Sequence, residues 1–243
     1  MNLYKLFILQ LIAHLLADFI FQNDEWSTDK KKYGFRSEKL YLHSSIVLAL
    51  SWTFSLQWNF FLFSLIISLV HFVVDGIKFR LSDLRFGKIK PLKNYVFFID
   101  QLVHFVAISL AVIIFNNMVE LNPVIAIPIT NHHMLIILGY LVCLKPSNVF
   151  IREIFTIYGI KIDRNADSDL LNAGRLIGNI ERVLTLTLLL MMQYEAVGFI
   201  IAAKSILRYE GVKTSKTEYV LIGSLLSFGI AIIAGITILK IHF

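Results

Sequence analysis

The chain has 243 residues, of which 57% are hydrophobic and 16% charged, and its formal net charge is +6. This composition, with a mean hydropathy of +0.71, lies outside the range of soluble globular proteins and indicates a membrane protein. The positive charge requires no nucleic-acid partner, because basic cytoplasmic loops account for it. Cys143 is the only cysteine, which excludes a disulfide within the chain and a cysteine-based zinc site.

Taken in chain order, the apolar stretches predict an all-α, polytopic transmembrane helix bundle of about eight membrane segments. We expect the first to be a retained span rather than a signal peptide, because no small-residue cleavage site follows it. Pro146 should bend the fifth near its middle, and the seventh is short for a span. The simplest description is a single integral-membrane domain, 1–243, with a four-helix half, 1–115, and a carboxyl-terminal half, 116–243. The expected segments are 3–22, 40–57, 59–79, 95–115, 132–158, 173–193, 196–209 and 218–239.

The loops between these segments predict the orientation of the chain. Lysine and arginine residues gather in 23–39, 80–94, 159–171 and 208–217, whereas the turn at 58–59 and the stretch 116–131 contain neither. Basic loops remain in the cytoplasm. The amino terminus should therefore lie outside, and with eight spans the carboxyl terminus should lie outside too.

Histidine and aspartate recur four residues apart within the apolar segments, in HLLAD, HFVVD and DQLVH, and a further histidine begins the second segment. Residues four apart share one helix face, so each pair directs an imidazole and a carboxylate to one point. The predicted topology places the whole set at one depth, near the cytoplasmic face. The residues are His14, Asp18, His43, His71, Asp75, Asp100 and His104.

This set predicts a metal centre. Ionised aspartates inside a membrane need a compensating partner, which a divalent cation supplies. Four imidazoles and three carboxylates exceed the ligands of one catalytic zinc and suit two ions about 3.5–4 Å apart; zinc, manganese and iron all accept such donors. A centre of this kind generates hydroxide and binds phosphoryl groups. We therefore predict a metal-dependent hydrolase of a phosphoester such as a lipid, with all seven residues as ligands and His14, Asp18, His71 and Asp75 as the catalytic ones.

Other interpretations of the same residues remain open. The pairs are also typical of buried hydrogen bonds or a proton relay, and the main alternative function is a proton- or metal-coupled transporter or channel. Against transport, the sequence shows no matching polar set on the outer half. Some aspartates could instead orient histidine ligands, and a metal could serve only to hold four helices together. A two-iron oxidase ranks last, since such membrane enzymes generally use more than four histidines.

The carboxyl-terminal half has polar residues of its own on the predicted inner side. One interpretation is that long cations extend to the interface and pair with Glu181 or Glu218. The other is an anion-binding patch for a lipid phosphate or substrate phosphate. Its donors would be Arg175, Arg182, Lys204 and Arg208.

Several motifs resemble a bacterial inner-membrane family described as domain of unknown function 3307. They are AHLLADFIFQ (13–22), HFVVDGIK (71–78) and DQLVH (100–104), and the carboxyl-terminal half is similar to longer members in GRLIGNIER (174–182), GFIIAAKSILR (198–208) and EYVLIGSLLS (218–227). The resemblance implies a multi-pass protein of the bacterial cytoplasmic membrane, among membrane lipids, and brings no activity. The His/Asp pattern is also similar to that of membrane-bound metal-dependent hydrolases and, more distantly, of zinc-dependent phospholipases C and nucleases, which is a likeness of fold rather than of function.

Overall fold

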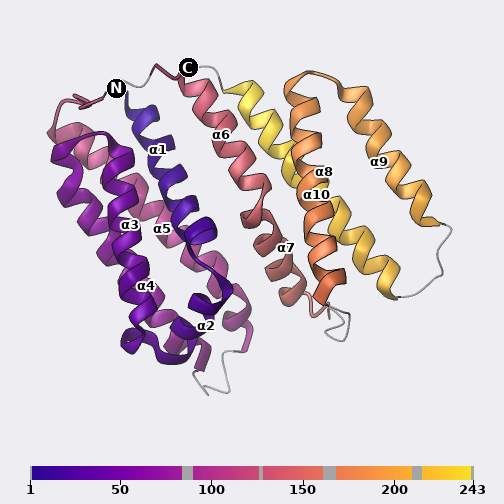
Figure 1. The fold of residues 1–243 in the computed structure, drawn as a ribbon, viewed down its shortest axis with the longest axis horizontal. Coiled ribbons are helices and arrows are strands. Elements are labelled where there is room, and N and C mark those ends of the chain that lie inside the picture. Colours follow the sequence, from indigo (N-terminus) through magenta and orange to yellow (C-terminus); the bar gives the residue numbers. More distant parts are fainter. Residues whose placement is uncertain (1, 84–89, 126–127, 161–167, 210–214, 242–243) are drawn as a thin grey trace. The chain divides into compact units, whose positions relative to one another are not determined.

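The computed structural model describes residues 2–83, 90–125, 128–160, 168–209 and 215–241 (Figure 1). Every regular element in these ranges is a helix, which confirms the all-α class. The chain divides into two compact units, Met1–Met134 and Leu135–Phe243, so that the description as one integral-membrane domain stays a prediction. Side chains are described over 2–78, 95–125, 128–160, 174–206 and 221–241.

Unit 1 is a bundle of four long helices with a short helix near one end (Figure 1). The long helices are α1 (Leu3–Leu15), α3 (Glu38–Ser55), α4 (Phe61–Asp83) and α5 (Lys90–Met118), and α1 continues into a π-helical segment, η1 (Leu16–Phe21). The short helix α2 (Asp24–Tyr33) and the 3-10 turn η2 (Gly34–Arg36) connect η1 to α3, and a second 3-10 turn, η3 (Trp58–Phe60), precedes α4.

Local sequence signals define the connection from η1 to α3. The side chain of Asn23 caps α2 by accepting a hydrogen bond from the Trp26 amide at 2.8 Å, and that of Ser37 caps α3 at the Leu40 amide; both residue types favour this position. Gly34 ends α2 with a φ of 55°, a left-handed conformation that glycine adopts without a steric penalty. Phe35 in η2 lies directly against Gly76 of α4.

The core of unit 1 contains an apolar cluster as well as many buried polar residues. The apolar part lies between α1, α3, α4 and α5, where Phe60 and Phe115 meet edge to face with ring centroids 4.9 Å apart. On α4, Leu62, Ile66 and Leu69 are exposed, while the opposite face buries Ser64, Ser68, His71 and Asp75. An apolar outer face and a polar inner face are typical of a helix in a membrane bundle, where polar side chains face the interior of the bundle.

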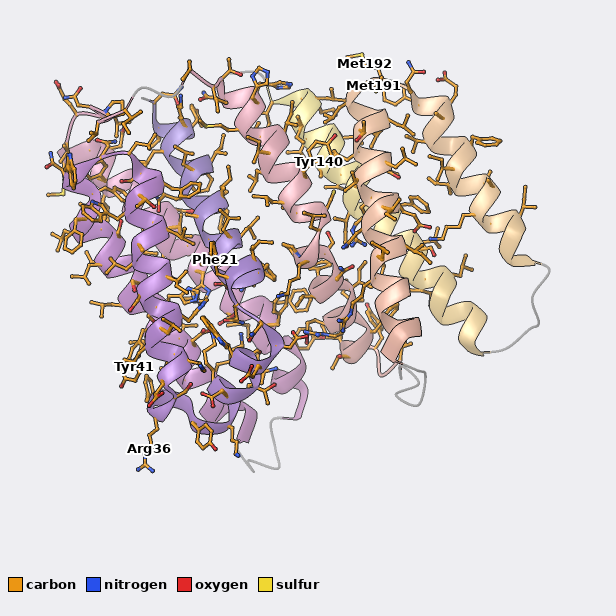
Figure 2. All side chains as sticks on the ribbon, viewed as in Figure 1. Phe21, Arg36, Tyr41, Tyr140, Met191 and Met192 are labelled. Carbon is orange, nitrogen blue, oxygen red and sulfur yellow. The ribbon has the colours of Figure 1, made fainter. Side chains whose placement is uncertain are left out.

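Unit 2 contains α7 (Lys145–Ile157), α8 (Ser168–Leu190), α9 (Tyr194–Tyr209), α10 (Ser215–Lys240) and most of α6 (Asn131–Cys143). The break between α6 and α7 lies next to Pro146 and bends the pair by 46°, which confirms the predicted bend. Proline has no amide hydrogen to donate to Val142, whose carbonyl instead accepts the Ser147 hydroxyl at 2.5 Å. Figure 2 shows Met191 and Met192 at the turn after α8, where Met192 has a positive φ.

Eight membrane segments are not supported. Among the described residues, four helices are long and apolar enough to cross a membrane, or five if the bent α6–α7 pair is one span; the four are Leu3–Phe21, Trp58–Lys78, Tyr95–Met118 and Leu221–Lys240. The correction concerns segments 40–57, 173–193 and 196–209. Four serines and a histidine make α3 too polar, Arg175, Glu181 and Arg182 add charge to α8, and α9 has only 16 residues.

The polarity of α3 has a structural reason. His43 near its start approaches His71 of α4, Ser51 in its middle contacts Ser64, and Trp52 packs on Trp58 at its end. The helix thus lies along α4 over its length, and its buried polar residues are His43, Ser44, Ser51 and Ser55. The location of the two termini is not tested by these observations and stays a prediction.

Candidate metal centre

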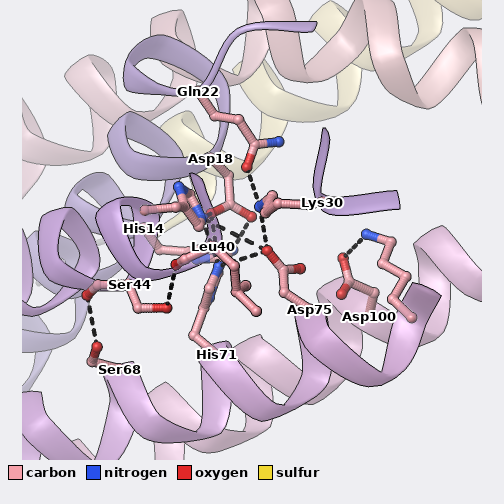
Figure 3. A network of polar contacts seen from close by, with 12 residues as sticks. His14, Asp18, Gln22, Lys30, Leu40, Ser44, Ser68, His71, Asp75 and Asp100 are labelled. Carbon is pink, nitrogen blue, oxygen red and sulfur yellow. Dashed lines mark hydrogen bonds and ion pairs between the residues drawn. The ribbon is translucent and has the colours of Figure 1, made fainter. Parts of the chain in front are cut away.

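Asp18 lies in the π-helical segment η1, next to the end of α1. A π turn is wider than an α turn and often marks a functional site. His14 Nε2 and Asp18 Oδ2 remain within 3.9 Å of each other. The other carboxylate oxygen, Oδ1, reaches two histidines on neighbouring helices (Figure 3).

Three of these atoms form a compact triangle. His43 Nε2 and His71 Nε2 are 2.9 Å apart, and Asp18 Oδ1 lies 3.3 Å from each. Tetrahedral zinc, with bonds of about 2.0–2.1 Å, separates its ligand atoms by about 3.3–3.4 Å. The three donors, from η1, α3 and α4, therefore already have nearly the spacing that a tetrahedral ion requires.

A fourth ligand is within reach. Asp75 Oδ2 lies 3.8 Å from His71 Nε2 and 3.9 Å from His43 Nε2. The predicted ligands form three overlapping groups, in each of which the donor atoms lie within 4.8 Å of one another: His14, Asp18, His71 and His104; His43, His71 and Asp75; and Asp75, Asp100 and His104. The structure thus brings all seven predicted residues together, and these groups could hold a metal ion.

Several buried nitrogen and oxygen atoms of this cluster have no hydrogen-bond partner among the described residues. Both ring nitrogens of His104 and the second oxygen of Asp100 are in this state, and Asp18 Oδ1 faces only the two imidazole nitrogens at 3.3 Å. The His104 ring stacks on that of His71 at a centroid distance of 3.9 Å. Buried polar atoms without partners are costly, so these atoms fit a site that binds an ion or water.

Two lysines enter the cluster. The ammonium group of Lys30, on α2, donates to Asp75 Oδ2 and to Gln22 Oε1, and that of Lys78 donates to Asp100 Oδ2 at 2.7 Å (Figure 3). Lys30 is only 7% exposed. With neutral imidazoles, three carboxylates and two ammonium groups leave one formal negative charge. One divalent ion would turn this into a single positive charge, which favours an anionic ligand.

Gln101 connects the two sides of the cluster. Its amide nitrogen lies 3.3 Å from Asp18 Oδ2 and 3.2 Å from Asp100 Oδ2, and its oxygen lies 3.4 Å from His14 Nε2. A residue in this position orients metal ligands without binding the metal. The His/Asp spacing in the sequence did not identify Gln101 or Lys30, because neither lies four residues from a histidine. Both residues join the cluster through contacts with side chains on other helices.

The predicted anion patch belongs to unit 2. Arg182 is fully buried and donates to Cys143 O, Ser227 Oγ and the side-chain oxygens of Asn148 and Asn179. Lys204 pairs with Glu181, as one sequence interpretation expected. Arg175 is exposed, and the side chain of Arg208 lies outside the described residues. No observation here tests anion binding, so the patch stays a prediction.

The fold and the cluster define a helical protein with candidate membrane spans and a buried His/Asp centre. The sequence profile of the family described as "Protein of unknown function (DUF3307)" matches residues 6–136, and the chain belongs to this family. The match covers nearly all of unit 1, including every residue of the cluster, whereas the resemblance of the carboxyl-terminal half lies beyond it and stays a prediction. No curated protein and no solved structure matches the chain.

Proposed function

We propose that this protein is a metal-dependent hydrolase that acts on a phosphoester such as a lipid. The triangle of Asp18 Oδ1, His43 Nε2 and His71 Nε2 carries this proposal. Its two 3.3 Å edges match the ligand spacing of a tetrahedral ion, and the 2.9 Å edge between the two histidines is shorter and would widen on binding. A divalent ion held by these residues would supply a hydroxide nucleophile and a positive charge for a phosphoryl oxygen. Zinc fits best, with manganese or iron as alternatives.

The donor set is larger than a purely structural ion requires. Three or four ligands complete a zinc site, yet His14, His104 and Asp100 remain beside the triangle and Asp75. A second ion bound by Asp75, Asp100 and His104 is part of the proposal. It would replace the ammonium groups of Lys30 and Lys78 at these carboxylates.

Hydrolysis of phospholipid in vesicles tests this function. The purified protein should release product from mixed phospholipid vesicles. This release should cease after treatment with a chelator and resume when zinc or manganese is restored. Asp18→Asn should abolish turnover, because the amide cannot replace a charged ligand, whereas Asp24→Asn, an exposed carboxylate on α2, should retain it. If turnover were insensitive to chelator, or equal in Asp18→Asn and wild type, the proposal would fail.

Transport is the second candidate, and one observation favours it. Beyond the cluster, unit 1 buries a hydrogen-bonded group on α1, α3 and α4: Ser51 Oγ donates to Gln10 Oε1 at 2.7 Å and lies 3.1 Å from Ser64 Oγ. Ser64 is two turns from His71, about 10 Å along α4. These residues show no His/Asp spacing, so the sequence did not identify this buried group.

Vesicle flux separates the two candidates. A transporter should move protons or labelled zinc across reconstituted vesicles, and Ser51→Ala with Gln10→Leu should reduce the rate at unchanged metal content. The hydrolase proposal predicts no such flux, and instead predicts turnover that the same substitutions leave intact.

A further inference from the structure

Lys30 is the buried charge of the cluster that neither the helix period nor metal ligation explains. It comes from α2, outside the four long helices, and its ammonium group lies between Asp75 Oδ2 and Gln22 Oε1. Lysine binds no metal while charged, so its role in the centre must be electrostatic. Lys31 and Lys32, the next residues on the same helix, are exposed, which shows that only Lys30 is directed inward.

The position of Lys30 is built into the fold by packing next to Asp75. Gly76 follows Asp75 on α4, and a Cβ atom there would lie 2.2 Å from Phe35 Cε1. The Phe35 ring is itself held by Phe72, at a centroid distance of 5.6 Å. The Ser37 hydroxyl, which caps α3, also donates to Asp29 of α2. These contacts hold α2 and η2 against the start of α3 and the inner face of α4.

Occupation of the centre by a metal changes the partner of Lys30. Asp75 Oδ2 is the carboxylate oxygen closest to completing the triangle of Asp18, His43 and His71, and it is the same oxygen that Lys30 contacts. When Asp75 binds an ion, its charge is shared with that ion. A buried ammonium group without a counter-charge is unfavourable, and the Gln22 oxygen is neutral. Lys30 then requires an anion beside the metal.

We propose that Lys30 binds an anionic oxygen of the substrate, namely a phosphate group, at the metal centre. This inference rests on the proposed function and adds the residue that selects the substrate class. A phosphate group has several anionic oxygens, so it can contact the ion and the ammonium group together. Such a group belongs equally to a lipid headgroup and to free phosphate.

Cobalt-substituted full-length protein provides a readout that is independent of turnover. Cobalt(II) bound to imidazole and carboxylate gives visible absorption bands, and addition of inorganic phosphate to the detergent-purified protein should shift them. Lys30→Met should keep the cobalt bands and weaken phosphate binding about 10-fold or more, the effect of losing one charge-assisted hydrogen bond. Lys32→Met, on the same helix but exposed, should match wild type, and Lys30→Arg should retain most of the affinity.

The outcomes separate this inference from the proposed function. If wild type binds no cobalt, the metal centre and the role of Lys30 both fail. If wild type binds cobalt but no phosphate, or if Lys30→Met binds phosphate as tightly as wild type, only the role of Lys30 is overturned. Should Lys30→Met not fold, Gly76→Ala, which displaces Phe35 and with it α2, should bind cobalt and lose phosphate affinity; unchanged affinity there also overturns it. Short-chain phosphatidate competing with phosphate would assign the site to lipids, and phosphate binding without such competition would assign it to soluble phosphoesters.

Discussion

Asp18 shows most clearly how single residues assemble the centre. Its two carboxylate oxygens serve different neighbours: Oδ2 faces His14 and Gln101, while Oδ1 faces His43 and His71. The sequence predicted the first contact, because four residues separate His14 from Asp18. The second was expected only through the shared centre, and the sequence did not indicate the π-helical conformation of η1, in which Asp18 lies. Nothing in LADFIF distinguishes a π turn from an α turn by residue type alone.

Gln101 should tune metal affinity without being a ligand. We expect Gln101→Ala to lower zinc affinity by about 10- to 100-fold, because the substitution removes the amide that orients Asp18 and His14. Competition with a chromogenic chelator measures this. Gln57→Ala, a buried glutamine at the other end of the α3–α4 hairpin, is the matched control, and an equal loss in both variants would contradict an orienting role.

Arg182 should contribute more to stability than Lys204. Replacing Arg182 by Leu removes the side-chain donor to the Cys143 carbonyl and to Asn148 Oδ1, whereas Asn179 Oδ1 keeps the Asn148 amide; the loss is about 1–3 kcal/mol for buried polar groups. The Lys204–Glu181 pair is more exposed, so Lys204→Met should cost less than about 1 kcal/mol. Thermal unfolding in detergent compares the stability lost in the two variants. A smaller loss for Arg182→Leu than for Lys204→Met would contradict the structural role of Arg182.

At the scale of elements, the positions of breaks and caps follow from the sequence, and the number of membrane spans does not. Pro146 predicted the bend between α6 and α7, because a missing amide hydrogen acts locally. Segment 40–57 looked like an ordinary span, yet His43 and three of its serines, Ser44, Ser51 and Ser55, are buried in unit 1. Apolar length alone cannot separate a lipid-facing helix from one whose polar face is buried by its neighbours.

The contact between η2 and α4 should depend on the absence of a side chain at position 76. Gly76→Ala places a methyl group within the Phe35 ring and should destabilise unit 1 by about 1–3 kcal/mol. In a protein that already carries Phe35→Ala, Gly76→Ala should leave the stability nearly unchanged, because the clash has gone. Gly229→Ala, at a glycine with open space around it, should not destabilise. Additive effects of Gly76→Ala and Phe35→Ala would refute the contact.

At the scale of the whole molecule, the family match and the cluster coincide. Residues 6–136 include α3, α4, α5, α1 from Leu6 onward and every His and Asp of the centre. The recurring His/Asp spacing made this set recognisable in the sequence, since each pair repeats a local period. The sequence did not identify the residues whose contacts join separate helices, because only the folded bundle brings these helices together. They are Lys30, Lys78 and the Gln10–Ser51–Ser64 group.

The orientation predicted from the basic loops is testable on the intact chain. In a Cys143→Ala background, Asn122→Cys should react with a membrane-impermeant maleimide in whole cells, and Lys32→Cys should react only after the cells are opened. Both positions are exposed in the structure, so accessibility should reflect the side of the membrane. The reverse labelling pattern would invert the topology and place the metal centre near the outer face.

Metal content tests the central claim most directly. Elemental analysis of detergent-purified protein should find at least one equivalent of zinc, manganese or iron in the wild type. The control His132→Ala, an exposed histidine outside the cluster, should retain it, and the double variant His43→Ala/His71→Ala should contain at least one equivalent less than the wild type while remaining folded. A wild type that binds no metal even after reconstitution, or a double variant that binds as much as the wild type, would contradict the metal centre.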